Sequence, residues 1–186
     1  MSSFYSVQEL AQLGLASYGK NVLISRKASL YSPEKMNIGS NVRIDDFCVL
    51  SGKITLGSYI HIAALCALYG GEAGIEFDDY STISSRGAVY AQTDDYSGEF
   101  MTNPMIPEKY LGLIQSPVYV GRHCIIGTGS TLLPGVRLEE GCAVGAMSLV
   151  NAGTEAWGIY AGVPARRIKE RSRNLLELCR EFEEER

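Results

Sequence analysis

The 186-residue sequence predicts an all-β fold in which the chain winds as a parallel β-helix. Aliphatic side chains recur every six residues over most of the chain, and glycine or another small or acidic residue often follows them. A second aliphatic or small residue lies four positions after most of these repeats. A period of six fits neither an amphipathic helix nor a flat strand, but it fits a short strand followed by a turn.

Two unbroken ladders contain the repeat. They are Ile38, Ile44, Leu50, Leu56, Ile62 and Leu68, and then Val120, Ile126, Leu132, Leu138, Val144 and Val150. Three units make one triangular coil of about 18 residues, and stacked coils enclose a continuous apolar core. This hexapeptide pattern is that of the left-handed parallel β-helix, the exception to right-handed crossovers, and we expect it over about residues 20–162.

The five cysteines and two histidines are explained largely by the same repeat. Four cysteines fall four positions after a ladder residue, and we expect them to be small buried fillers: Cys48, Cys66, Cys124 and Cys142. No Cys-x-x-Cys pair exists, which argues against a zinc finger or a thioredoxin-type motif. We expect His61 to point outward, His123 to be exposed at a turn, and no metal to be bound.

The two ends of the chain depart from the repeat. Residues 6–18 predict a short helix with Ser6 as N-cap and Glu9 at the capping-box position. Residues 164–184 predict an amphipathic helix, because Ile168, Leu175 and Phe182 are seven apart. Its apolar stripe is expected to cover the open end of the coil stack, or to form a seam with neighbouring subunits. The length predicts a single domain over 1–186.

Composition excludes several classes of function. Lys plus Arg is 17 and Asp plus Glu is 21, a net charge of −4, so no basic excess exists to bind nucleic acid. No apolar run approaches the roughly 18 residues that a membrane span needs, so we expect no membrane insertion. The first residues resemble no signal peptide, and a cytoplasmic location is the default expectation.

One long segment, residues 91–117, interrupts the repeat. It contains Gly98, Pro104, Pro107, Gly112 and Pro117 together with several aromatic and aliphatic residues. A loop this long in a compact repeat protein is usually functional or disordered. Its apolar residues predict an ordered, packed and functional loop.

The hexads, the long loop, the segment VYVGRHCIIGTGSTLLPGV and the ending YAGVPARRIK together resemble the hexapeptide-repeat acyltransferases. More narrowly, the chain resembles the small trimeric enzymes that acylate sugars, above all the N-acyltransferases of dTDP-4-amino-4,6-dideoxyglucose and its relatives. This resemblance implies acetyl-CoA or another acyl-CoA as cosubstrate, a nucleotide-linked amino sugar as acceptor, and a cytoplasmic homotrimer with active sites at subunit interfaces. The expected role is O-antigen or other surface polysaccharide biosynthesis.

Within that resemblance, Asp94 is the expected catalytic residue. The related sugar O-acetyltransferases have a histidine early in the long loop as general base toward a hydroxyl, and Asp94 occupies that place here. A hydroxyl needs a competent base, whereas an amine needs mainly to be aimed and to lose one proton. A carboxylate can do both, so Asp94 favours an amine acceptor. The adjacent Asp95 is a weaker candidate for this role.

The remaining candidates divide between acceptor and donor. Residues expected to contact the acceptor are Ser84, Arg86, Tyr90, Glu99 and, across a subunit interface, His61. The resemblance implies that Thr128 and Ala146 contact the pantetheine arm, with Gly127 and Gly145 allowing close approach, and that Arg166 and Lys169 bind the adenosine phosphates. A lysine near the donor in the family is replaced here by the stretch Asn151-Ala152-Gly153.

Three alternatives remain at this point. One is a sugar O-acetyltransferase of the galactoside or maltose type, with His61 or Asp94 as base. Another is a non-catalytic trimeric binding module. A carbonic anhydrase on this fold takes three histidine ligands on zinc, which two histidines per chain cannot supply in the usual pattern.

Overall fold

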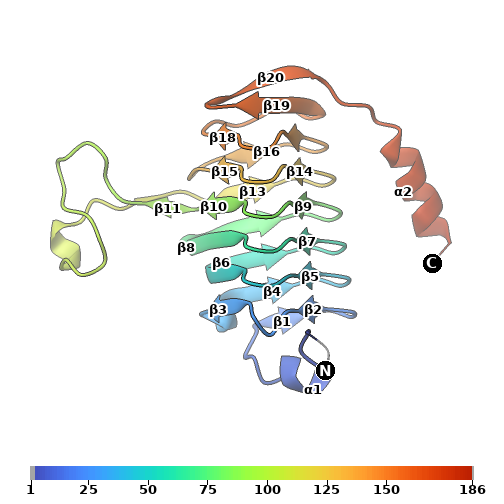
Figure 1. Ribbon diagram of the computed structural model, residues 1–186, viewed down its shortest axis with the longest axis horizontal. Coiled ribbons are helices and arrows are strands. Elements are labelled where there is room, and N and C mark those ends of the chain that lie inside the picture. Colours follow the sequence, from blue (N-terminus) through green and yellow to red (C-terminus); the bar gives the residue numbers. More distant parts are fainter. Residues whose placement is uncertain (1–2, 186) are drawn as a thin grey trace.

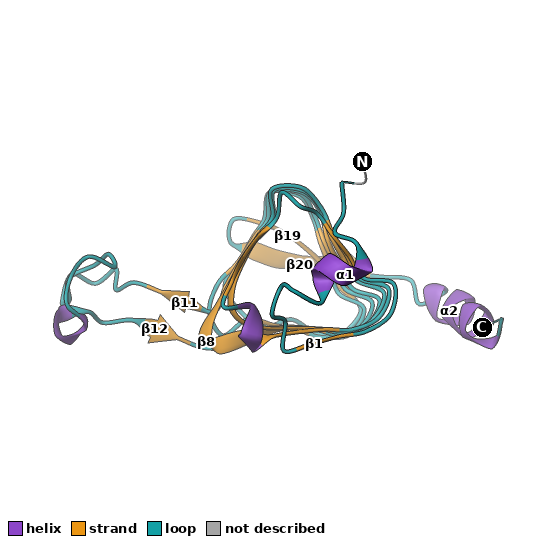
Figure 2. Ribbon diagram, turned by 90° about the horizontal axis from the view of Figure 1, so that it is seen from below, coloured by secondary structure: helices purple, strands orange, loops and turns teal. Residues whose placement is uncertain are grey.

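The computed structural model describes residues 3–185 as a left-handed parallel β-helix whose coils stack into a triangular prism (Figures 1 and 2). Eight strands form one side of the prism: β2 (Leu23–Ile24), β5 (Arg43–Ile44), β7 (His61–Ile62), β9 (Thr82–Ile83), β14 (Ile125–Ile126), β17 (Ala143–Val144), β19 (Gly158–Gly162) and β20 (Ala165–Glu170). We call its solvent side the eight-stranded face. The predicted fold class is confirmed.

Ten strands form the other hydrogen-bonded sheet. They are β1 (Ser17–Tyr18), β3 (Ser29–Tyr31), β4 (Met36–Ile38), β6 (Val49–Leu56), β8 (Ala67–Phe77), β10 (Ala88–Tyr90), β13 (Val118–Val120), β15 (Thr131–Leu132), β16 (Arg137–Leu138) and β18 (Leu149–Val150). Neighbouring coils pair in parallel and in register, as Leu50 does with Leu68. A short 3₁₀ helix, η1 (Pro33–Lys35), follows β3.

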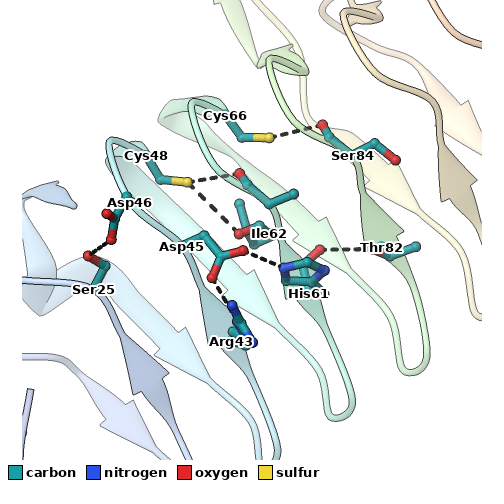
Figure 3. A network of polar contacts seen from close by, with 11 residues as sticks. Ser25, Arg43, Asp45, Asp46, Cys48, His61, Ile62, Cys66, Thr82 and Ser84 are labelled. Carbon is teal, nitrogen blue, oxygen red and sulfur yellow. Dashed lines mark hydrogen bonds and ion pairs between the residues drawn. The ribbon is translucent and has the colours of Figure 1, made fainter. Parts of the chain in front are cut away.

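The ladder residues fill the interior of the prism, as the six-residue period predicts. Ile44, Leu50, Ile62 and Ile126 have no solvent-exposed surface, and Phe77 is the largest fully buried side chain among the described residues. The four ladder cysteines are also buried as free thiols. Their Sγ atoms donate to backbone carbonyls, as from Cys66 to Ser84 at 3.2 Å (Figure 3). The cysteines therefore serve packing.

One corner of the prism carries a column of aromatic rings on residues in the left-handed backbone region. Tyr59, Tyr80 and His123 have φ near +60°, and their rings stack with centroids 4.9 and 5.2 Å apart. The prediction that His123 is exposed is wrong: only 7% of its surface is accessible. This burial lowers the pKa of His123, and the nearby charges of Arg122 and Arg171 lower it further.

At the N-terminus, helix α1 (Val7–Leu10) is much shorter than the predicted 6–18. The capping box is present: the Ser6 hydroxyl accepts from the Glu9 amide, and the Glu9 carboxylate accepts from the Ser6 amide at 2.8 Å. The helix ends at Leu10 and the chain continues as turns to Gly14, which adopts a φ of +75°, after which Ser17–Tyr18 join the sheet as β1.

At the C-terminus, the predicted helix over 164–184 is wrong in its first half. Residues 165–170 form β20, which pairs antiparallel with β19 and covers the last coil. Helix α2 (Leu175–Glu184) stands beside the prism instead of over its end (Figures 1 and 2). The Phe182 ring meets Tyr59 edge-on at 5.4 Å, and the Glu183 carboxylate accepts from the Tyr80 hydroxyl at 2.8 Å. The helices within residues 3–185 are too short and too polar to span a bilayer.

Candidate functional site

The long loop is an arm that leaves the prism after β10 and returns before β13 (Figures 1 and 2). Its stem is an antiparallel pair, β11 (Gln92–Thr93) with β12 (Ile114–Gln115), and a 3₁₀ turn, η2 (Glu108–Tyr110), lies farther out. The prediction of a packed loop is wrong within one chain, because Tyr96 and Met105 are about nine-tenths exposed. The arm projects beyond any surface of its own chain that could cover it.

An open pocket of about 530 Å³ lies where the stem joins the prism. We call it the arm pocket. Its lining residues come from strands β8 and β10, from the outgoing stem and from the rest of the arm: Tyr69, Tyr90, Gln92, Thr93, Asp94, Tyr96, Asn103, Pro104, Leu111 and Leu113. It is therefore walled mainly by aromatic and aliphatic side chains, with one carboxylate.

The adjacent aspartates of the arm differ in what they contact. Asp95 is engaged in a turn, in which its carboxylate accepts from the Ser97 hydroxyl at 2.8 Å and the Gly98 amide at 2.9 Å. The bonds from Ser97, with those from Gly98 and Phe100, lower the pKa of Asp95 to about 2. The Asp94 carboxylate has no hydrogen-bond partner among the described residues and lines the arm pocket. Asp94 is thus the aspartate available to a ligand.

Two tyrosines form the wall of the arm pocket nearest to the prism. Tyr69 and Tyr90 are paired across β8 and β10, and their rings stack with centroids 5.1 Å apart. Burial raises the pKa of Tyr90, and the neighbouring phenols of Tyr69 and Tyr96 add to this effect. The Tyr90 phenol is therefore a neutral hydrogen-bonding group at physiological pH. Glu99, by contrast, is exposed and lies outside this lining.

A second group of predicted residues lies at a different corner, where the eight-stranded face ends. Ser84 is half-buried and Arg86 is exposed with a φ of +61°. The Thr128 hydroxyl donates to the Ser85 carbonyl at 2.6 Å, so this side chain ties two coils together. Ala146, one coil farther on, is exposed.

Gly127 serves the stacking of coils at this corner. A Cβ built on Gly127 would lie 2.5 Å from the backbone nitrogen of Ala146 in the next coil. This is closer than any real carbon contact, so the neighbouring coil itself requires glycine here. This packing requirement is independent of the expectation that Gly127 lets the donor come close, which stays a prediction.

His61 belongs to a polar network on the eight-stranded face (Figure 3). Its Nε2 lies 2.7 Å from an Asp45 carboxylate oxygen, and Arg43 donates to the other oxygen at 2.7 Å. Burial opposes ionisation of Asp45, but the bonds from His61 and Arg43 prevail and lower its pKa. The His61 side chain is 45% exposed and points outward as predicted, with Nδ1 left for a further contact.

Arg166 and Lys169 lie on β20, at the C-terminal end of the same sheet. Arg166 pairs with Ala161 and Lys169 with Ile159, and the register shifts between these pairs. Directly opposed residues share a face, and positions 159 and 161 of β19 face the same way. The irregularity therefore brings both cations to one face. No carboxylate of residues 3–185 forms an ion pair with either side chain, so both are available to an anion.

The structure thus separates the predicted residues into two groups. Tyr90 and Asp94 are in the arm pocket, whereas His61, Ser84, Arg86, Thr128, Ala146, Arg166 and Lys169 lie on or beside the eight-stranded face. Strand β10 lies between the groups and is roughly 10 Å long at 3.3 Å per residue. Sequence reasoning did not place the other pocket-lining residues in the site: Tyr69, Gln92, Thr93, Tyr96, Asn103, Pro104, Leu111 and Leu113. Of these residues, only Tyr69 could have been found from the sequence, because it occupies the position equivalent to Tyr90 in the preceding coil.

A left-handed β-helix with one long inserted arm is the architecture that the resemblance to hexapeptide-repeat acyltransferases predicts, and the comparison with known proteins identifies the class. No family model matches the chain. It is, however, 46% identical over 173 residues to a dTDP-4-amino-4,6-dideoxy-D-glucose acyltransferase of Escherichia coli, covering 91% of this chain and 90% of that protein. The chain belongs to the family of that enzyme, and the predicted resemblance is confirmed.

Solved structures agree with this assignment. AntD, an N-acyltransferase from Bacillus cereus, is 53% identical with a TM-score of 0.98, and the match covers 100% of both chains. Its structures include a D94N variant with dTDP and coenzyme A and an S84A variant with dTDP-4-amino-4,6-dideoxyglucose and coenzyme A. A maltose O-acetyltransferase from Clostridium difficile, 17% identical with a TM-score of 0.56, covers 89% of this chain and 74% of its own, and shares the fold.

Proposed function

We propose that this protein transfers an acyl group from an acyl-CoA to the 4-amino group of dTDP-4-amino-4,6-dideoxyglucose, in the assembly of a surface polysaccharide. The observation that carries the proposal is the unpaired Asp94 carboxylate in the arm pocket. Two relatives support the substrate: the E. coli enzyme is named for this sugar, and AntD has been crystallised with it. AntD has also been crystallised with 3-hydroxybutyryl-CoA, which makes acyl groups longer than acetyl candidates as well.

In the proposed reaction Asp94 holds the sugar ammonium and accepts one of its protons. The freed nitrogen lone pair attacks the thioester carbonyl, the carbon–sulfur bond breaks, and the coenzyme A thiolate leaves. The second proton that the nitrogen loses on becoming an amide balances the proton that the thiolate takes up. An amide and free coenzyme A result, with no covalent enzyme intermediate. The four ladder cysteines are buried, and none is used in this scheme. The AntD variants support this scheme, because they replace an aspartate at position 94 and a serine at position 84. This chain has the same residue types at those two positions.

The donor lies along the eight-stranded face in this proposal, with Arg166 and Lys169 on its phosphates and Ala146 beside the pantetheine arm. The acceptor lies in the arm pocket. Because these two regions are at opposite ends of β10 in one chain, we infer that an arm from one subunit meets the eight-stranded face of the next in a homotrimer. His61, Ser84 and Arg86 then contact the acceptor across that interface, while Glu99 remains a weaker candidate.

Exposed apolar side chains support an assembly of this kind. Phe47, Leu65 and Met147 are each more than half exposed along one corner, and the arm exposes further apolar residues. Light scattering on a sizing column should give a mass near three times the 20.3 kDa of one chain. A single-chain mass at assay concentrations would contradict the shared site. The five free thiols and both cosubstrates fit a cytoplasmic enzyme.

Thiol release measures the reaction directly. The protein is mixed with acetyl-CoA or 3-hydroxybutyryl-CoA and with the amino sugar or its 4-hydroxy counterpart. We expect release with the amine only. Equal release with the hydroxyl compound would favour the O-acetyltransferase. No release together with no heat on titration of acetyl-CoA would indicate a non-catalytic module.

A further inference from the structure

The arm pocket combines one carboxylate with an aliphatic wall, and the register of the arm stem places the two side by side. Gln92 pairs with Gln115 and Thr93 with Ile114, so the next opposed positions are Asp94 and Leu113. Opposed residues of an antiparallel pair have Cβ atoms about 5 Å apart and point to the same face. Both residues line the arm pocket.

The aliphatic wall has a second member and a support behind it. Leu111 lies two residues before Leu113 and also lines the pocket, while Gly112 between them faces the Phe100 ring. A Cβ at Gly112 would lie 2.4 Å from that ring, so glycine lets Phe100 pack directly against the backbone of the wall. The wall is therefore held in place from outside the pocket.

A 4-amino-4,6-dideoxyhexose matches this juxtaposition. Its amino group and its C6 methyl are attached to neighbouring ring carbons, C4 and C5. A sugar whose nitrogen is held by Asp94 consequently has its methyl within reach of the residue opposite Asp94. That residue is Leu113, which is 41% exposed and thus has surface left to bury against a ligand.

We propose that Leu113, with Leu111 beside it, makes the enzyme prefer an acceptor sugar that has a methyl group rather than a hydroxymethyl group at C5. The inference rests on the proposed function and deepens it by naming the side chains that select a 6-deoxy sugar. When the acceptor carries a hydroxyl at C6, that hydroxyl gives up its hydrogen bonds to solvent water on binding. It then contacts only aliphatic carbon and is left without a hydrogen-bond partner. Aliphatic pockets discriminate against an added hydroxyl by about 10²-fold at most.

The test compares two acceptors in the thiol-release assay: a dTDP-linked 4-amino-4,6-dideoxyglucose and the same compound with a 6-hydroxyl. We expect the wild-type kcat/KM to favour the 6-deoxy sugar by about 10- to 100-fold. Leu113→Asn keeps the branched shape and the number of side-chain heavy atoms but can hydrogen-bond, and it should reduce that ratio by about tenfold. Ile114→Asn is the matched control, since Ile114 is a neighbouring exposed aliphatic that does not line the pocket, and it should leave the ratio unchanged.

The measured acceptor ratios can overturn the role of Leu113 without touching the proposed function. A wild-type ratio within about twofold of one, or the same ratio in Leu113→Asn and wild type, overturns the inference while leaving the proposed function intact. If Leu113→Asn does not fold, as judged by circular dichroism, Leu113→Ala replaces it, and its preference must also fall. Absence of thiol release with either sugar in the wild type removes the proposed function and the inference with it.

Discussion

In the coil stack, aliphatic residues six positions apart are almost completely buried, whereas the arm exposes Tyr96, Phe100 and Met105 to solvent. Both regions are rich in apolar residues, and they differ in periodicity. A strict period lets each side chain pack on its equivalents in the coils above and below, so the stack buries its own core. The arm has no period and no partner surface in its own chain. The comparison indicates that the stack provides stability and position, while the arm provides surface for ligands and neighbours.

Replacing one phenylalanine in each region gives the largest contrast. Phe77→Ala leaves a cavity in the centre of the stack and should destabilise the protein by about 3–5 kcal/mol. Phe100→Ala removes a half-exposed ring and should cost less than about 1 kcal/mol. Urea unfolding followed by circular dichroism, at one protein concentration, measures both. Equal losses would mean that the arm packs as part of the core in the assembled protein.

The proposed binding site for the acyl-CoA phosphates lies on the stack itself, at its C-terminal end. Arg166→Ala should raise the KM for acyl-CoA by about tenfold while kcat changes by less than about twofold, because the guanidinium contacts phosphates remote from the reacting atoms. Arg167→Ala is the control, since Arg167 pairs with Glu155 and Glu170. A loss confined to kcat in Arg166→Ala would contradict its assigned place.

The smallest expected effect concerns how well the turn at Asp95 orders the arm. The folded-state pKa of Asp95 is lowered to about 2, so the turn it holds is fully favoured above the ordinary carboxyl pKa and weakens as pH falls toward 2. Hydrogen exchange at the Gly98 and Phe100 amides, corrected for intrinsic rates, should therefore rise roughly two- to tenfold between pH 6 and pH 3. Asp95→Asn should show faster exchange at pH 6 and little change with pH. Equal pH dependence in both proteins would exclude Asp95 as the cause.

The sequence predicts the stack far better than the arm, for a physical reason. Each coil repeats its neighbour, so a ladder position such as Ile62 has its burial fixed by period alone. Tyr69 and Tyr90 each follow a buried ladder residue, and these residues pair in neighbouring coils. Nothing periodic relates Asn103 or Leu111 to Asp94, because the arm folds back through turns that its sequence does not specify.

The two helix predictions failed where another element competed for the same residues. Ile168 matches a seven-residue helical spacing with Leu175, yet it lies in β20, which supplies hydrogen bonds to the exposed edge of β19. Likewise, residues 17–18 lie within the predicted N-terminal helix but pair with β4 as strand β1. The separation of Asp94 from Ser84 also could not be predicted, because it depends on where the arm leaves the prism.

The central claim is that the Asp94 carboxylate acts on the acceptor amine, and Asp94→Asn tests it most directly. Glu108→Gln, an exposed carboxylate elsewhere on the arm, is the matched control. We predict that Asp94→Asn lowers kcat by about 10²-fold or more, while the Kd of coenzyme A measured by calorimetry stays within about twofold of wild type. Unchanged turnover in Asp94→Asn, or a loss equally large in Glu108→Gln, would contradict the account.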